Sequence, residues 1–203
     1  MFDFLIPSFI ASYLLGSISS AIIICSIMNL PDPRTQGSKN PGATNVLRIG
    51  GKKIAAFVLL FDGLKGALPV MLAHYFGVSL FELTIILLCA FLGHLFPIFY
   101  GFKGGKGVAT YIGGLIGLNF FVGLTFSIIW LIVAKIMKVS SIAALIATFL
   151  SPIYFYFIMN YYFFEPHIFK ATLVIVLINL FIYFTHRANI MRIINGEEGV
   201  IGS

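Results

Sequence analysis

The sequence predicts an all-α integral membrane protein with seven transmembrane helices, two of them short, whose N-terminus lies outside and whose C-terminus is cytoplasmic. Apolar residues make up 60% of the 203 residues and charged residues only 10%, a composition typical of polytopic membrane proteins. The apolar residues form long runs, and nearly all lysines and arginines lie between these runs. A chain of this length fits one domain, so we expect a single polytopic membrane domain over residues 1–203.

Five apolar runs are each long enough to cross a bilayer once: Phe4–Met28, Ile54–Gly77, Leu80–Tyr100, Ile142–Tyr162 and Ile168–Thr185. The first run lacks a basic n-region and is too long for the apolar part of a signal peptide, so we interpret it as a retained span. A further stretch, Val108–Ala134, fits either one tilted span or two short ones. Its middle contains small or polar residues at which a helix breaks easily, namely Gly113, Gly114, Gly117 and Asn119.

Charge distribution favours two crossings in Val108–Ala134. With two, all but two of the 13 lysines and arginines fall on one membrane side, the exceptions being Lys65 inside a span and Lys170 opposite. With one crossing, four cations change sides and the asymmetry is largely lost. Cytoplasmic loops are enriched in lysine and arginine, so the distribution predicts seven spans with that side in the cytoplasm. The two short helices then require a locally thinned membrane or burial inside the bundle.

Some polar or small residues lie inside the expected spans. Asp62 and Lys65 are three positions apart and so share a helix face. A charge is costly inside a membrane, so we expect a buried ion pair, with direct substrate contact as the alternative. A patch of small residues in the first span is typical of close helix packing: Gly16, Ser17, Ser19 and Ser20. Cys25 and Cys89 fall within apolar runs and do not indicate a disulfide framework.

The longest polar interruption is Thr35–Arg48. Within it, Asn40-Pro41-Gly42 predicts a tight turn in which proline fixes one φ angle and glycine supplies a positive φ at the next position. Such a turn directs backbone N–H groups into one concavity that suits an anion. Hydroxyls, an amide and cations surround it, from Ser38, Lys39, Thr44, Asn45 and Arg48. The alternative is an ordinary basic loop between two membrane helices.

A second polar stretch follows His94 and Pro97, where proline kinks or ends the helix. Glycines surround two lysines there and lead directly into the next helix: Gly101, Lys103, Gly104, Gly105, Lys106 and Gly107. A glycine-rich turn at a helix N-terminus is a good phosphate site, although the spacing is not that of a Walker A loop. The alternative is a flexible basic turn.

Two more polar groups fall on the same side in the seven-span topology. Ser140 and Ser141 open the sixth span, where one hydroxyl could cap the helix and both could contact a substrate. His186 and Arg187 suit the C-terminus of the last helix, whereas Asn189 and Glu197–Glu198 have no such simple explanation. Together the polar stretches predict a cytoplasmic site for phosphate-bearing ligands. We expect no metal, no cofactor and no nucleic acid, because no ligand cluster is present and the cations lie at membrane boundaries.

Three segments carry a resemblance to a known family: Gly37–Asn45 (G-S-K-N-P-G-A-T-N), Gly93–Pro97 (G-H-L-F-P) with Phe102–Ala109 (F-K-G-G-K-G-V-A), and His186–Asn189 (H-R-A-N). In this order and over nearly the whole chain, the sequence resembles the bacterial acyl-phosphate:glycerol-3-phosphate acyltransferases, the PlsY family. The resemblance implies a seven-span inner-membrane enzyme that transfers a fatty acyl group from acyl phosphate to the 1-hydroxyl of sn-glycerol 3-phosphate. The products are lysophosphatidic acid and inorganic phosphate, in the first acylation of phospholipid synthesis, and an acyl-phosphate-producing enzyme is the implied functional partner.

The resemblance also implies roles for individual residues. The implied catalytic residues are Ser38, Arg48, Lys106, His186 and Asn189. The first four would hold glycerol 3-phosphate, with Asn189 and Ser141 nearby. The turn Asn40–Asn45 would cradle the phosphoryl group of acyl phosphate. The implied substrate-binding residues are Asn40, Gly42, Thr44, Asn45, His94, Lys103, Gly104, Gly105, Ser141, Arg187 and Glu198, of which His94 and Glu198 match positions without an assigned role. Two positions depart from or vary within the pattern: Ser19, where many members carry proline, and Lys39, where glycine is also common.

Two other functions fit the polar stretches taken alone. One is a transporter for an organic phosphate, which the clustering of polar stretches on one face and the lack of inverted repeats disfavour. The other is a phosphatase or phosphotransferase that acts on lipid phosphates.

Overall fold

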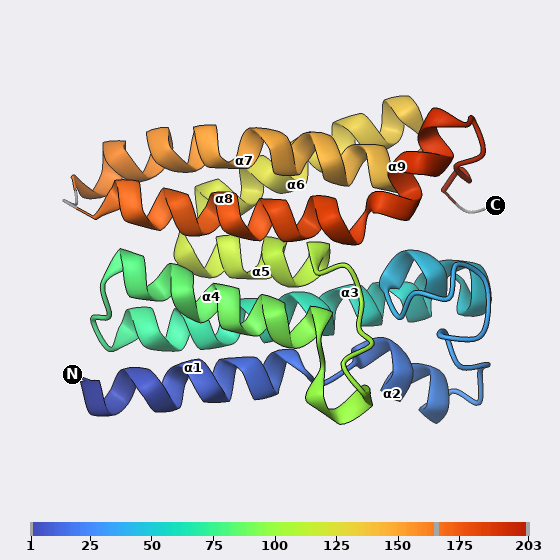
Figure 1. Cartoon of the computed structure of the whole chain (residues 1–203), viewed down its shortest axis with the longest axis horizontal. Coiled ribbons are helices and arrows are strands. Elements are labelled where there is room, and N and C mark those ends of the chain that lie inside the picture. Colours follow the sequence, from blue (N-terminus) through green and yellow to red (C-terminus); the bar gives the residue numbers. More distant parts are fainter. Residues whose placement is uncertain (1, 165–166, 202–203) are drawn as a thin grey trace.

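The structure, a computed structural model, describes residues 2–164 and 167–201. Within these ranges the regular elements are all helices, and most run side by side along the long axis of the molecule (Figure 1). In chain order they are α1 (Phe2–Gly16), α2 (Ser20–Ile27), α3 (Ala43–Tyr75), α4 (Leu80–Leu95), the 3-10 helix η1 (Ile98–Tyr100), α5 (Val108–Leu118), α6 (Phe120–Met137), α7 (Ser140–Phe163), α8 (Ile168–Thr185) and α9 (Arg187–Ile194). The two ends of the chain lie at opposite ends of this bundle (Figure 1).

The helices are those of a multi-pass membrane protein. Across the described ranges, five helical segments are long and apolar enough to cross a membrane: Ala43–Tyr75, Leu80–Tyr100, Phe120–Met137, Ser140–Tyr161 and Ile168–Thr185. The bent pair α1 and α2 makes a sixth if it is counted as one span. Helix α5 is apolar but has only 11 residues, about half of the length that an independent span needs.

The first apolar run, which the sequence predicts to be one span, consists of two helices that are separated by a break between Gly16 and Ser20 with a bend of 42°. Ser19 stands at the N-cap of α2, where its hydroxyl accepts a hydrogen bond from the N–H of Ile22 (3.5 Å). The break therefore forms without a proline at this position. The expected close packing is confirmed at Gly16, since a Cβ there would overlap the carbonyl oxygen of Ala90 in α4.

The stretch Val108–Ala134 is confirmed as two helices, which separate at Asn119. The backbone of Asn119 is extended, and its side chain accepts hydrogen bonds from the N–H groups of Phe121 (2.9 Å) and Val122 (3.3 Å) at the start of α6. The two helices are unequal, because α6 continues to Met137 and has 18 residues.

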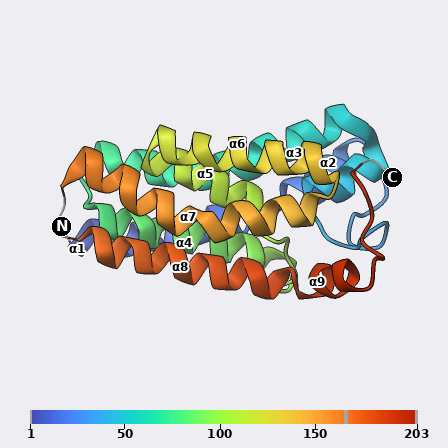
Figure 2. The same ribbon diagram turned by 90° about the horizontal axis from the view of Figure 1, so that it is seen from above.

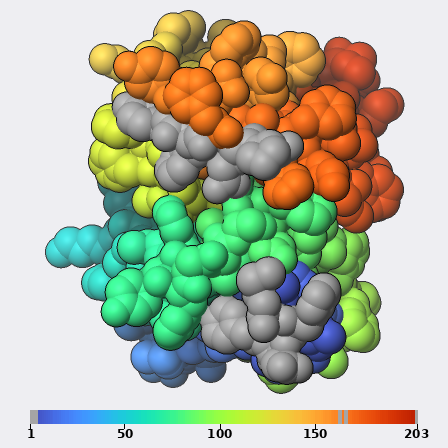
Figure 3. Space-filling model, turned by 90° about the vertical axis from the view of Figure 1, so that its left-hand side faces the viewer, coloured from blue at the N-terminus to red at the C-terminus, as the bar shows by residue number. Residues whose placement is uncertain are grey.

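Helix α5 lies in the middle of the bundle and packs against α3, α4 and α6 (Figure 2). Glycines allow the closest of these contacts: a Cβ on Gly113 would overlap the carbonyl oxygen of Gly63 in α3. Tyr111 and Leu115 of α5 are fully buried in the core. Viewed from the left-hand end of Figure 1, the start of α4 lies between α1 and the connected ends of α7 and α8 (Figure 3). The short helix α5 is thus largely buried against the longer helices α3, α4 and α6.

Candidate active site

The loop before α3 is held in shape by Asn45, a buried residue in the first turn of that helix. Its side-chain oxygen accepts a hydrogen bond from the N–H of Ser38 (2.8 Å), and its side-chain amide donates to the carbonyls of Pro33 (2.8 Å) and Gln36 (3.0 Å). One amide side chain therefore fixes the position of Ser38 relative to α3.

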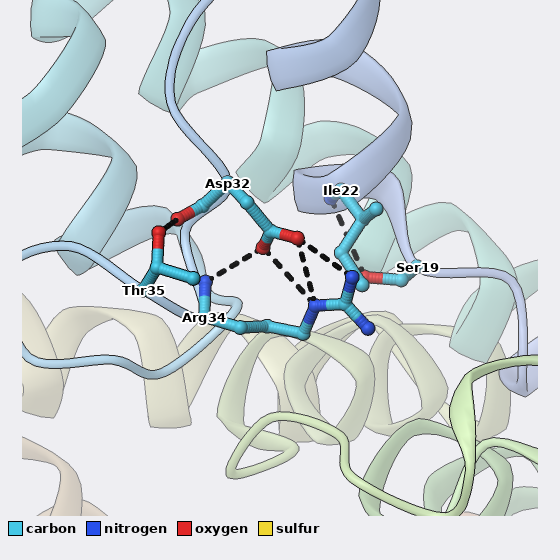
Figure 4. A network of polar contacts seen from close by, with 5 residues as sticks. All are labelled: Ser19, Ile22, Asp32, Arg34 and Thr35. Carbon is cyan, nitrogen blue, oxygen red and sulfur yellow. Dashed lines mark hydrogen bonds and ion pairs between the residues drawn. The ribbon is translucent and has the colours of Figure 1, made fainter.

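An ion pair closes the turn that leads into this loop (Figure 4). The guanidinium of Arg34 lies 2.6 Å from Asp32, and the N–H of Arg34 and the hydroxyl of Thr35 also donate to Asp32 (2.8 and 2.9 Å). The hydrogen bonds from Arg34 lower the pKa of the Asp32 carboxyl. Neither partner lines the cavity described below, so the pair shapes the loop rather than the site.

The expectation of a positive φ at Gly42 is wrong. Gly42 is extended (φ −140°) and stands at the N-cap of α3, whereas the left-handed positions are Gly37 and Lys39, both with φ 57°. The loop reverses before the Asn40-Pro41-Gly42 sequence, so Gly42 only has to lead into the helix. This places the N-terminus of α3, with its unpaired N–H groups, beside Ser38, an arrangement that favours an anion.

The glycine-rich loop lies flat on the end of α4. The N–H groups of Gly104 and Gly105 donate to the carbonyls of Leu95 and His94, each at 3.1 Å. A Cβ on Gly105 would overlap the imidazole of His94, so only glycine allows this close approach. Gly107 then takes φ 84° and begins α5. The loop thereby presents Lys106 to the centre of the molecule.

Lys106 meets a polar network at the C-terminal end of the chain. Its ammonium group bonds the side-chain oxygen of Asn189 in α9, and the amide of Asn189 donates to Glu198 (2.5 Å). The same carboxylate accepts a hydrogen bond from the hydroxyl of Ser141 in α7 (2.7 Å) and pairs with Arg192 (2.7 Å). Five side chains from the glycine loop, α7, α9 and the C-terminal tail thus converge.

The electrostatics of this network are those of a partly buried cationic site. Burial lowers the pKa of Lys106 to about 8, an effect that Arg192 and Arg48 increase and Glu198 opposes. Burial also raises the pKa of Glu198, but its hydrogen bonds with Ser141, Asn189 and Arg192 more than offset this, and the net shift is downward. Glu198 is therefore a carboxylate at neutral pH.

His186 is a neutral imidazole in this environment. Burial and the nearby Lys106 lower its pKa to about 4, despite opposing contributions from the backbone and Glu198. Its Nδ1 lies 2.8 Å from the carbonyl oxygen of Ile182. A carbonyl oxygen only accepts hydrogen bonds, so Nδ1 carries the proton and Nε2 is left as an acceptor.

Three buried ionisable groups lie deeper in the bundle. Asp62 and Lys65 form the expected ion pair, with Nζ and Oδ1 2.9 Å apart, and Nδ1 of His94 lies 3.7 Å from the same carboxylate oxygen. Asp62 and His94 line the cavity, whereas Lys65 does not. Of this pair, Asp62 is therefore placed to contact a substrate in the cavity, and Lys65 is not.

A cavity of about 1090 Å³ joins these groups. At one end it is polar, with the loop before α3, Lys106, α9 and the C-terminal tail around it. From there it continues between α3, α5 and α6, where its lining is mainly apolar: Leu59, Leu60, Leu64, Met71, Ile112, Ile116, Trp130 and Leu131. Polar and apolar ends in one cavity suit a ligand with a charged head and a long apolar chain.

Most of the expected site residues line this cavity: Ser38, Asn40, Gly42, Thr44, Asn45, Arg48, His94, Lys106, Ser141, His186, Asn189 and Glu198. Four do not. Lys103 is exposed, Gly104 and Gly105 contact the end of α4, and Arg187 is exposed with its guanidinium 4.5 Å from the ring centre of Phe184.

Two features of the site depart from the sequence analysis. Arg192 lines the cavity, although the sequence indicates it only as a cytoplasmic cation. Its spacing of three residues from Asn189 places both on one helix face and is the signal that could have identified it. Neither Ser140 nor Ser141 is an N-cap, because Val139 takes that position; instead the hydroxyl of Ser140 lies 3.3 Å from that of Thr44.

The chain is similar in sequence to a family of membrane acyltransferases. Residues 6–196 match the family described as glycerol-3-phosphate acyltransferase. A glycerol-3-phosphate acyltransferase of Ruthia magnifica subsp. Calyptogena magnifica is 56% identical over 190 residues, which cover 94% of this chain and 93% of that protein. One from Thioalkalivibrio sulfidiphilus is 49% identical over 96% of this chain and 92% of its own length.

Solved structures show the same fold. A crystal structure of PlsY (YgiH), an integral membrane glycerol 3-phosphate acyltransferase, in its glycerol 3-phosphate form superposes with a TM-score of 0.87 at 34% identity, covering 98% of this chain and 96% of that one. The lysophosphatidic acid form gives a TM-score of 0.84 at 33% identity, over 97% and 94% of the two chains. This chain belongs to the glycerol-3-phosphate acyltransferase (PlsY) family of integral membrane enzymes.

Proposed function

We propose that the protein transfers a fatty acyl group from acyl phosphate to the 1-hydroxyl of sn-glycerol 3-phosphate, giving lysophosphatidic acid and inorganic phosphate. The observation that carries this proposal is that one cavity has cations and hydroxyls at one end and an apolar trough between α3, α5 and α6 beyond it. Both the donor and the product combine a phosphate, which fits the polar end of the cavity, with an acyl chain, which fits the apolar trough. The glycerol 3-phosphate and lysophosphatidic acid forms of the PlsY relative support the same acceptor and product.

In the proposed complex, glycerol 3-phosphate lies among Ser38, Arg48, Lys106 and Asn189 at the polar end. Two of these side chains are cations, which match the charge of a phosphate monoester. Neutral His186 supports binding in a different way, because its Nε2 can accept a hydrogen bond from a glycerol hydroxyl. The phosphoryl group of acyl phosphate would lie against the N-terminus of α3 and the loop before it.

The chemical step is a direct acyl transfer. The 1-hydroxyl oxygen attacks the acyl carbon, the bond between that carbon and the phosphate oxygen breaks, and the hydroxyl proton passes to a phosphate oxygen. An acyl phosphate is a mixed anhydride with a good leaving group, so no covalent acyl-enzyme is required. Arg48 and Lys106 would stabilise the charge on the departing phosphate.

The proposed setting is the bacterial cytoplasmic membrane, with seven passes, the N-terminus outside and the active site facing the cytoplasm. Seven passes require α1 with α2 to count as one broken span and α5 as a short one. The positions of the chain ends at opposite ends of the bundle support an odd number of passes (Figure 1). The lysines and arginines gathered at the active-site end support a cytoplasmic location for it. An enzyme that produces acyl phosphate would be the functional partner.

Phosphate release from a long-chain acyl phosphate tests the proposal. The purified protein in lipid should release inorganic phosphate only when glycerol 3-phosphate is present, with lysophosphatidic acid as co-product and without coenzyme A. Release without the acceptor would identify a phosphatase. No release by folded protein, together with counterflow of glycerol 3-phosphate in liposomes, would identify a transporter.

Substitutions at the polar end test the residue assignments. Ser38→Ala, Lys106→Ala and Asn189→Ala should each abolish turnover while the protein stays folded. Full activity of all three variants would overturn the assignment, and Lys103→Ala, at an exposed position outside the cavity, is the matched control.

A further inference from the structure

A second cavity, of about 550 Å³, lies at the end of the molecule opposite the polar site. Its lining comes from the last turn of α3, the end of α5 and the start of α6: Met71, His74, Tyr75, Ile116, Gly117, Leu118, Asn119 and Phe120. The side-chain oxygen of Asn119 is occupied at the N-terminus of α6, so the remaining surface is mostly apolar. This end of the molecule faces the viewer in Figure 3.

The two cavities are neighbours that share two lining residues. Met71 of α3 and Ile116 of α5 line both of them. At this point α3 and α5 approach closely, since a Cβ on Gly117 would lie 2.9 Å from the carbonyl oxygen of Ala67. A chain that follows the apolar trough away from Lys106 therefore reaches Met71 and Ile116 before it reaches the second cavity.

We infer that the second cavity receives the distal end of a long acyl chain, and that Met71 and Ile116 determine which chain lengths are transferred fastest. The inference rests on the proposed function, because the acyl chain enters from the polar end. Shorter chains end before the two side chains, whereas longer chains gain further apolar contact in the second cavity by passing them. Methionine is flexible enough to let a chain pass and is thereby suited to this position.

Substitution of Met71 tests the inference. Met71→Trp should lower kcat/KM for long-chain acyl phosphates by about tenfold or more relative to shorter chains, because single methylene groups already change discrimination by such factors. Met71→Ala should move the preferred length towards longer chains. The assay is transfer to glycerol 3-phosphate by the full-length protein in lipid, with a series of saturated acyl phosphates that compete pairwise.

Leu68→Trp is the matched control. Leu68 lies one turn earlier on α3, is 53% exposed like Met71, and lines neither cavity. It should leave the chain-length profile unchanged. Phe120→Ala is the second variant in case Met71→Trp does not fold, since Phe120 lines only the second cavity and its truncation should affect only the longest chains.

The outcomes separate the inference from the proposed function. A shift of the profile in Met71→Trp or Phe120→Ala, with none in Leu68→Trp, supports the inference. Acyl transfer with the same profile in all variants, or with an equal loss at every chain length, overturns it and leaves the proposed function standing. A wild-type protein that transfers no acyl chain of any length overturns both.

Discussion

Lys65 donates a hydrogen bond of 2.9 Å from its ammonium group to the backbone carbonyl of Ile18. Ile18 lies in the break between α1 and α2, where backbone carbonyls lack partners within a helix. The same ammonium group pairs with the carboxylate of Asp62. One buried cation thus stabilises both a buried carboxylate and the open backbone of a broken span, which an apolar segment tolerates only when such groups are satisfied.

Lys65→Met should therefore destabilise the protein strongly. The variant leaves the Asp62 carboxylate without its cation and the Ile18 carbonyl without a donor. Loss of one partner of a buried pair costs about 3–5 kcal/mol. The measurement is thermal or chemical unfolding of the purified protein in detergent, compared with wild type.

The double variant Asp62→Asn/Lys65→Met is the control for this prediction. It has no unpaired charge, so it should recover much of the lost stability and retain only the cost of the unpaired Ile18 carbonyl, about 1–3 kcal/mol. Equal destabilisation of the single and double variants would show that the ion pair is not the cause.

The same pair shows how far sequence reasoning extends. The spacing of Asp62 and Lys65 on a helix predicts their contact, because it depends only on helix geometry. The contact with Ile18 joins residues 47 positions apart and depends on how α1 and α3 pack. Local sequence carries no information on such a contact.

The active site likewise contains residues that the sequence predicts and residues that it does not. The residues in the four polar stretches were predictable as a group, because the positive-inside rule and the resemblance place them on one membrane face. An apolar groove for an acyl chain could be expected, but the residues that line it could not be predicted, since Leu60, Ile112 and Trp130 come from three helices and do not differ in sequence from other apolar residues of the spans. The left-handed conformation of Lys39 was also missed. A positive φ is expected at a glycine, so the sequence points to Gly42 rather than to Lys39.

The depressed pKa of Lys106 predicts a loss of activity at alkaline pH. With a pKa of about 8 in the free protein, Lys106 loses its proton, and with it its charge, as pH rises through that value. The ammonium form is the one that binds phosphate, so kcat/KM for glycerol 3-phosphate should be level below this pH and fall above it. A pH profile of initial rates measures this.

Lys106→Arg supplies the control, because a guanidinium stays protonated throughout this range. Whatever its absolute rate, its residual activity should lack the decline near pH 8. A decline of the same shape in this variant would assign the titration to a group other than Lys106.

Glu198→Gln should shift the alkaline decline to lower pH. The negative charge of Glu198 supports the protonated form of Lys106, so its removal lowers the pKa of the ammonium group further, by up to about one pH unit. Arg192 also loses its carboxylate partner. Glu197→Gln, at the exposed neighbouring position, should leave the profile where it is. A profile that shifts upward in Glu198→Gln would contradict the arrangement of charges described here.

Lys39 is the most testable backbone feature, because a non-glycine residue there holds φ at 57°. A left-handed conformation costs an L-residue about 1–2 kcal/mol, which glycine avoids. Lys39→Gly and Lys39→Ala both remove the cation, but only the first relieves the backbone. We therefore expect Lys39→Gly to be more stable than Lys39→Ala by about 1 kcal/mol in unfolding measurements, while both variants show the same change in KM for glycerol 3-phosphate. Equal stability of the two variants would mean that the loop rearranges when the lysine is lost, and the strain would then not be a property of this position.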